Sequence, residues 1–249
     1  MFLFTHIEKC AGTSFNEILS LTYPRYIHIT KNKYGGNEKR NDLTDVQFKK
    51  ILRFYPSGIG GHSVRPYLEF LPKAKRITFL REPIARYISQ YNHLKDTGWV
   101  HSIDEFFKNE FYYDFITKKI AGENDYKNAE LLLAYFHFIG NTNEYNKSLN
   151  YLQDVLNIKL IGKSEQKNQR KHNTNYLKYS DLSESQKLKV EENNKNDIKL
   201  YENFVLKNNQ LNNYSDKINF KEPSALRVKL IRKLNKYKKE KIINPIRLV

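Results

Sequence analysis

Residues Met1 to Phe15 read MFLFTHIEKCAGTSF, and they give the clearest indication of the architecture. Its first seven residues are mostly apolar and predict a buried strand. After a loop of small residues, apolar side chains recur at helical spacing, at Phe15, Ile18, Leu19 and Leu21. A strand, a short loop and a helix in this order direct backbone N–H groups at an anion. The stretch therefore predicts a phosphate-binding loop.

The residue types in the loop fit an anion. Ala11 and Gly12 let the backbone approach a ligand closely, Thr13 and Ser14 add hydroxyl donors, and Lys9 adds a positive charge. The common nucleotide loop, G-x-x-x-x-G-K-[ST], is absent here, because the lysine lies three residues before the glycine and no glycine begins the loop. An ordinary strand-to-helix turn is the alternative interpretation.

A second strand-to-helix junction follows at ITFLREPIARYISQY, residues 77–91. Pro83 suits the first turn of a helix, where its missing N–H has no partner to lose. Arg81 at the strand end and Ser89 on the helix are then expected to converge. Strands followed by helices predict an α/β fold with a central, mostly parallel sheet and a ligand at the strand carboxyl ends.

Further elements are predicted from local patterns. We expect strands or strand-and-turn segments at Tyr26–Thr30, Gly58–Ser63, Phe138–Thr142 and Lys159–Gly162, and helices at Asp45–Phe54, Ala129–Phe138, Ser148–Leu156 and Leu182–Val205. The compact domain is expected to span residues 1–207, and residues 208–249 to form a linker and a basic helical tail.

Composition limits the partners. The 249 residues carry a formal net charge of +16, which favours an anionic partner: a nucleotide, a nucleic acid, an acidic glycan or a membrane surface. A single cysteine, Cys10, excludes an internal disulfide framework and a multi-cysteine zinc site. No signal peptide or membrane-spanning run is visible, so the sequence predicts a cytoplasmic protein, with the inner face of a membrane as an alternative.

The tail is amphipathic. Residues 227–241 contain eight lysines or arginines and one glutamate, a net charge of +7, and Leu226, Leu230, Leu234 and Tyr237 fall on one face. Such a helix either lies on an anionic membrane or packs on the protein's own domain.

Two segments together resemble a known family. Residues 6–15, HIEKCAGTSF, are similar to the 5′-phosphosulfate loop of sulfotransferases, and residues 79–91, FLREPIARYISQY, are similar to their 3′-phosphate-binding strand and helix. The resemblance covers roughly residues 1–205 and is strongest to carbohydrate sulfotransferases of the glycosaminoglycan 2-O-sulfotransferase type and their bacterial relatives. It implies a P-loop-like sulfotransferase fold.

The resemblance also implies a donor, 3′-phosphoadenosine 5′-phosphosulfate, with adenosine 3′,5′-bisphosphate as product. The 5′ end would be held by Lys9, Ala11, Gly12, Thr13, Ser14 and Phe15. Arg81 and Ser89 would hold the 3′-phosphate, and the basic loop around Lys171 would add a further contact. Glu8 departs from the pattern, since many relatives carry proline there.

Transfer of a sulfuryl group needs a base at the acceptor hydroxyl and positive charge at the leaving phosphate. His62 is the expected base, in a place where related enzymes use a histidine, and Lys9 is expected at the phosphate. Other candidates are His6, His28, His93 and His172, with Glu8 and Glu82 as alternative bases. No metal is implied.

The expected acceptor is a saccharide hydroxyl on a glycan, a capsule or a lipid-linked sugar. Two other functions are weighed against this one. A P-loop kinase or NTPase is disfavoured by the displaced Lys9 and by the lack of an acidic strand end for magnesium. A nucleic-acid-binding protein is supported by charge alone, because the basic residues are spread widely and no recognition motif is found.

Overall fold

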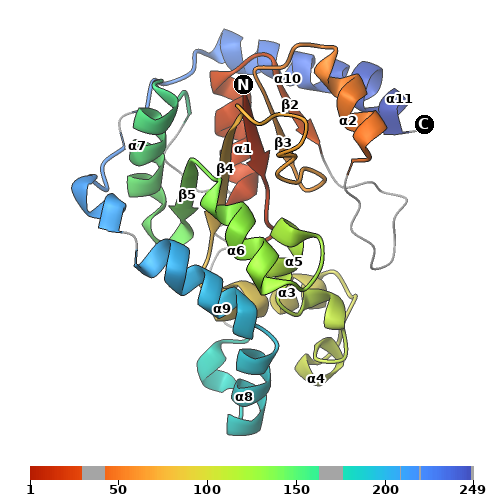
Figure 1. Ribbon diagram of the computed structural model, residues 1–249, viewed down its shortest axis with the longest axis vertical. Helices are drawn as coiled ribbons and strands as arrows, with labels where there is room; N and C mark the ends of the chain where they lie inside the picture. Colours follow the sequence, from red (N-terminus) through yellow and green to blue (C-terminus); the bar gives the residue numbers. More distant parts are fainter. Residues whose placement is uncertain (30–42, 163–175, 208, 219, 248–249) are drawn as a thin grey trace.

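The computed structural model describes residues 1–29, 43–162, 176–207, 209–218 and 220–247 (Figure 1). Its centre is a five-stranded sheet in the order β2-β3-β1-β4-β5, and every pairing is parallel. The strands are β1 (Phe2–Thr5), β2 (Tyr26–Ile29), β3 (Gly58–Gly61), β4 (Lys75–Leu80) and β5 (Phe138–Asn141). The predicted parallel α/β sheet is therefore confirmed.

Helices follow and cover the strands. The N-terminal half contributes α1 (Gly12–Thr22), α2 (Asp45–Leu52), α3 (Pro83–Asp96), α4 (Ile103–Phe106), α5 (Phe115–Ala121) and α6 (Tyr126–Ala134). The C-terminal half contributes α7 (Tyr145–Leu156), α8 (Glu184–Glu192), α9 (Lys195–Tyr201), α10 (Ala225–Lys238) and α11 (Asn244–Arg247). Two π-helical segments, Glu202–Leu206 and Lys239–Ile243, continue α9 and α10.

The central strand is buried on both faces, which explains its unbroken apolar sequence. Phe2 and Phe4 belong to a large cluster with Phe15 and Leu19 of α1. Leu3, whose side chain points to the other face, belongs to a second cluster with residues of α2 and α11. Because all five strands are parallel, their carboxyl ends lie at one edge of the sheet.

The helix predicted over residues 129–138 is α6, which begins at Tyr126 and ends at Ala134, before β5 begins at Phe138. Two further predicted elements differ from the structure. Residues 159–162 do not form a strand, because Ile161 makes only an isolated bridge to Lys221. The predicted helix over residues 182–205 is divided into α8 and α9 at Asn193 and Asn194, where the carbonyl of Asn193 accepts a hydrogen bond from the backbone of Asp114. Both differences come from tertiary contacts that local patterns do not encode.

The C-terminal segment packs on the domain. Ile231 of α10 contacts Leu21 of α1 and Ile161, and Ile243 and Ile246 enter the cluster beneath α2. The inward side of α10 therefore packs on the protein's own domain, which is one of the two predictions made for the tail. The boundary at residue 207 stays a prediction, but the segment beyond it is held against the sheet domain.

Candidate active site at the carboxyl edge of the sheet

The loop after β1, His62 and Arg81 lie where β1, β3 and β4 end. Thr5, the last residue of β1, pairs with Gly61 at the end of β3 and with Thr78 of β4. The residues that follow these strands therefore begin at nearly the same level. In Figure 1 the strands run from the N-terminus toward α3 and α5, so this edge faces those two helices.

The loop after β1 has the backbone form of an anion cradle. Lys9 and Ala11 both adopt positive φ angles, 69° and 58°, which are unusual for residues other than glycine. Turns of this kind point successive N–H groups into one concavity. Ala11 caps α1 without a side-chain hydrogen bond, and the first turn of α1 holds no acidic residue. The positive end of α1 is thus open to an external anion.

Gly12 is required by a contact inside the loop. A Cβ atom at this position would lie 1.9 Å from Cδ2 of His6. The His6 ring is buried and its Nδ1 lies 3.2 Å from the amide nitrogen of Asn16, which also donates to the carbonyl of Gly12 over 2.7 Å. His6 therefore supports the loop from beneath. Burial, reinforced by nearby His62, holds the pKa of His6 well below its usual value, so the ring is neutral.

His62 is in contact with the buried His6 ring. Its ring stacks on His6 with centroids 3.8 Å apart, and its Nδ1 lies 3.3 Å from a carboxylate oxygen of Glu8. The His62 side chain is 22% exposed, whereas Glu8 is nearly buried. Nδ1 has no hydrogen-bond partner among the described residues, but a carboxylate at this distance would stabilise a positive charge on the ring. The pair can therefore take up a proton from a bound hydroxyl.

Arg81 approaches the same loop from β4. One guanidinium nitrogen lies 3.4 Å from the carbonyl of Lys9 and is its hydrogen-bond donor. Arg81 is half-buried, and burial lowers its pKa from the usual value, although an arginine keeps its charge at neutral pH. Ser89 is half-buried two turns along α3. The neighbouring Glu82 caps α3, because its two carboxylate oxygens accept hydrogen bonds from the backbone N–H groups of Ile84 and Ala85.

Residues 1–130 match the family model described as "Sulfotransferase family". The match covers more than half of the chain and includes β1, α1, β3, β4 and α3. The chain belongs to the sulfotransferase family. No curated protein matches this sulfotransferase significantly in sequence.

The remaining predicted donor contacts of the sulfotransferase fall in different places. Thr13 is exposed and Ser14 is buried at the start of α1. The Phe15 ring is fully buried between Phe4 and Phe79, and its N–H donates to the carbonyl of Ala11, so its side chain packs in the core. Lys171 and His172 lie outside the described residues.

Two other histidines lie in different surroundings. His28 of β2 is largely buried, and burial lowers its pKa to about 4, so it is a packed neutral ring. His93 lies near the C-terminal end of α3, away from the strand ends. Among the described residues, no group of histidine, cysteine and acidic side chains could hold a metal ion.

Three charged residues near the site were not predicted from the sequence. Lys119 of α5 is buried and donates to the carbonyl of His62. Arg86 is fully buried over the ring of Phe115, and Asp197 receives hydrogen bonds from the backbone of Ile116 and Thr117 at the start of α5. The sequence hinted at two of them only, because Lys119 and Arg86 are charged residues within otherwise apolar helix faces.

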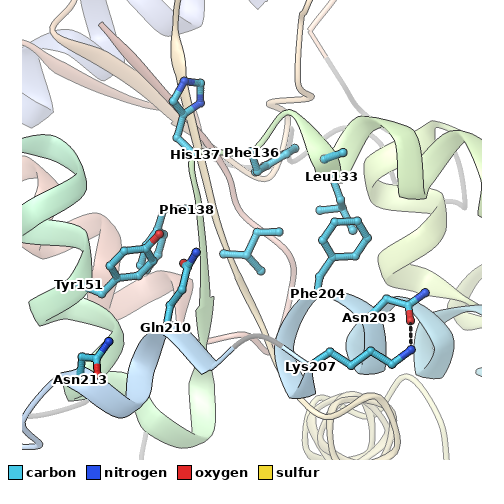
Figure 2. Close-up of a pocket in the computed structure, with 12 residues that line it drawn as sticks. Leu133, Phe136, His137, Phe138, Tyr151, Asn203, Phe204, Lys207, Gln210 and Asn213 are labelled. Carbon is cyan, nitrogen blue, oxygen red and sulfur yellow. Dashed lines mark hydrogen bonds between the residues drawn. The ribbon is translucent and has the colours of Figure 1, made fainter.

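A cavity of about 740 Å³ lies elsewhere, beside β5 (Figure 2). Tyr151 and Phe204 lie on opposite sides of it, and Phe138 and Ile139 of β5 line it. None of the predicted site residues borders this cavity. It is therefore separate from the strand ends where the candidate active site lies.

Proposed function

We propose that the protein transfers a sulfuryl group from 3′-phosphoadenosine 5′-phosphosulfate to a hydroxyl group of a carbohydrate. Membership of the sulfotransferase family supports the reaction class. The observation that carries the donor assignment is the juxtaposition of two anion-binding features at one sheet edge. These are the uncapped N-terminus of α1 and the Arg81 guanidinium, 3.4 Å from the carbonyl of Lys9.

The two features suit the two ends of the donor. The positive N-terminus of α1, at Gly12, Thr13 and Ser14, favours an anion, so this turn and the Lys9 ammonium would hold the 5′ end. The planar guanidinium of Arg81 offers several donors to one phosphate, and the Ser89 hydroxyl adds another, so these two would hold the 3′-phosphate. The donor supplies the sulfuryl group and a stable bisphosphate leaving group.

Proton transfer is assigned to His62. The acceptor oxygen forms a bond to sulfur while the bond from sulfur to the phosphate oxygen breaks, and the hydroxyl proton passes to Nε2 of His62. Glu8 would stabilise the resulting imidazolium through Nδ1, 3.3 Å away. Lys9 would neutralise the charge that develops on the phosphate oxygen.

The carbohydrate acceptor is inferred from the resemblance to carbohydrate sulfotransferases and from the charge of the chain. A net charge of +16 attracts an anionic glycan at long range. The compartment is proposed to be the cytoplasm. Among the described residues, no helix has the length and apolar character needed to cross a membrane.

The test is transfer of radiolabelled sulfate from the donor onto a panel of saccharides, with product masses determined. We expect labelled sugar with the parent protein and none with His62→Ala, which should still bind adenosine 3′,5′-bisphosphate. A protein that labels no saccharide but sulfates a phenol or an amine would overturn the acceptor class. Full activity of His62→Ala would overturn the base assignment.

A further inference from the structure

The outward side of α10 is the feature that neither the fold nor the proposed reaction uses. Ile231 and Lys238 are the buried residues of this helix. Arg227 donates twice to the carbonyl of Leu21, over 2.9 and 2.7 Å, and Lys238 donates to the carbonyls of Pro24 and Tyr26. These hydrogen bonds of Arg227 and Lys238 attach α10 to the end of α1 and the start of β2. They therefore determine which side of α10 faces water.

That outward side is both apolar and basic. Leu226, Leu230 and Tyr237 are 76%, 61% and 57% exposed. At 3.6 residues per turn, these three and Lys233 fall within about 60° of one another. Lys229 and Lys236 lie next to them on the same helical spacing, and the segment has three further exposed basic residues, Arg232, Lys239 and Lys241. Glu240 is the one acidic residue between positions 227 and 241.

We propose that this face, Leu226, Lys229, Leu230, Lys233, Lys236 and Tyr237, binds the surface of a membrane that contains anionic lipids. The lysines match the negative headgroups, and the two leucines and the tyrosine enter the boundary between headgroups and acyl chains. A nucleic acid or an acidic glycan would also pair with the lysines. It would leave the leucines in water, and for that reason a membrane fits the face better.

The attachment has a geometric consequence. α10 lies against the C-terminal end of α1 and the first residues of β2, at the amino-terminal edge of the sheet. The loop after β1 and Arg81 lie at the carboxyl edge. Figure 1 shows α10 at the end of the molecule opposite α3 and α5. A protein bound through α10 therefore holds its candidate active site away from the lipid, open to the aqueous phase.

The test is co-sedimentation of the full chain with vesicles of phosphatidylcholine alone or mixed with phosphatidylglycerol. We expect binding to the mixed vesicles that weakens as salt is raised. Leu226→Ser with Leu230→Ser, and Lys229→Glu with Lys233→Glu and Lys236→Glu, should each weaken binding about tenfold or more. These side chains are exposed, so the variants should fold, and their melting temperatures check this.

A matched control carries the same charge change elsewhere. Lys73→Glu with Lys108→Glu and Lys127→Glu alters three exposed lysines outside α10 and should leave binding nearly unchanged. A local readout uses Tyr237→Trp in a Trp99→Phe background, where the sole tryptophan emission should shift to the blue on mixed vesicles. The proposal is overturned if the parent protein ignores mixed vesicles, if the serine variant binds as well as the parent, or if the control variant loses binding equally.

Discussion

Gly12→Ala tests whether the loop is built on the His6 ring. The added methyl carbon would lie 1.9 Å from Cδ2 and 2.0 Å from Nε2 of His6, far inside van der Waals contact. The His6 ring has little room to rotate away, because it is buried and hydrogen-bonded to Asn16, and its centroid lies 3.8 Å from that of the His62 ring. Overpacking of this kind costs about 1 to 3 kcal/mol.

The loss should be visible in thermal unfolding. For a chain of this length, each kcal/mol lowers the melting temperature by about 2 to 4 °C, so we expect a decrease of about 2 to 12 °C. Binding of adenosine 3′,5′-bisphosphate, followed by calorimetry, should weaken as well, because the displaced ring carries the loop with it.

Two variants separate the clash from other effects. In a His6→Ala background the methyl group enters vacated space, so Gly12→Ala should then cost less than about 1 kcal/mol. Gly98→Ala adds a methyl group where no atom lies within 4 Å, at a φ of +74°, and should change stability through backbone strain without affecting nucleotide binding. A Gly12→Ala protein as stable as the parent, or an equal cost in the His6→Ala background, would show that the His6 ring does not exclude a side chain at position 12.

Three further predictions concern individual side chains. Glu8→Gln should lower kcat about tenfold or more while the donor KM stays nearly constant, because the carboxylate charge beside Nδ1 is lost; a parent-like kcat would rule out this role. Cys10 is buried and burial raises its pKa to about 12, so Ellman's reagent should leave the native thiol unmodified and react with it only after unfolding; rapid native reaction would contradict the packing. Burial raises the pKa of Asp197 from 3.8 to about 6, so the folded state binds this proton more tightly than the unfolded state does. The unfolding free energy should therefore decrease as the pH rises from 4 to 6, by on the order of 3 kcal/mol. Urea unfolding of Asp197→Asn should lack this component, and a constant difference from the parent across that pH range would disprove it.

The parts of the site that the sequence predicted are local in the chain. The loop at residues 8–14 and the Arg81 junction each lie within one strand-to-helix unit, so their residue types reveal their geometry. Parallel order then brings the two units to one edge. His62 was predicted from resemblance to related enzymes, and its contact with Glu8 follows from the pairing of β1 with β3.

The parts that the sequence did not predict depend on contacts between distant segments. Asp197 binds the start of α5 across 80 residues, and no local pattern marks that partnership. The clash that forbids a side chain at position 12 depends on the orientation of the His6 ring. The sequence placed Leu226 and Leu230 on one face, but the side of α10 that packs depends on contacts of Ile231, Arg227 and Lys238 with α1 and β2.

The most direct test of the central claim compares two nucleotides on two proteins. Adenosine 3′,5′-bisphosphate and adenosine 5′-monophosphate differ only in the 3′-phosphate, the group assigned to Arg81. Calorimetry without magnesium should show that the parent protein prefers the bisphosphate about tenfold or more, and that Arg81→Gln abolishes this preference with little change in monophosphate binding. If Arg81→Gln weakens both nucleotides equally, or if the parent protein binds them alike, one nucleotide does not bridge the two anion-binding features.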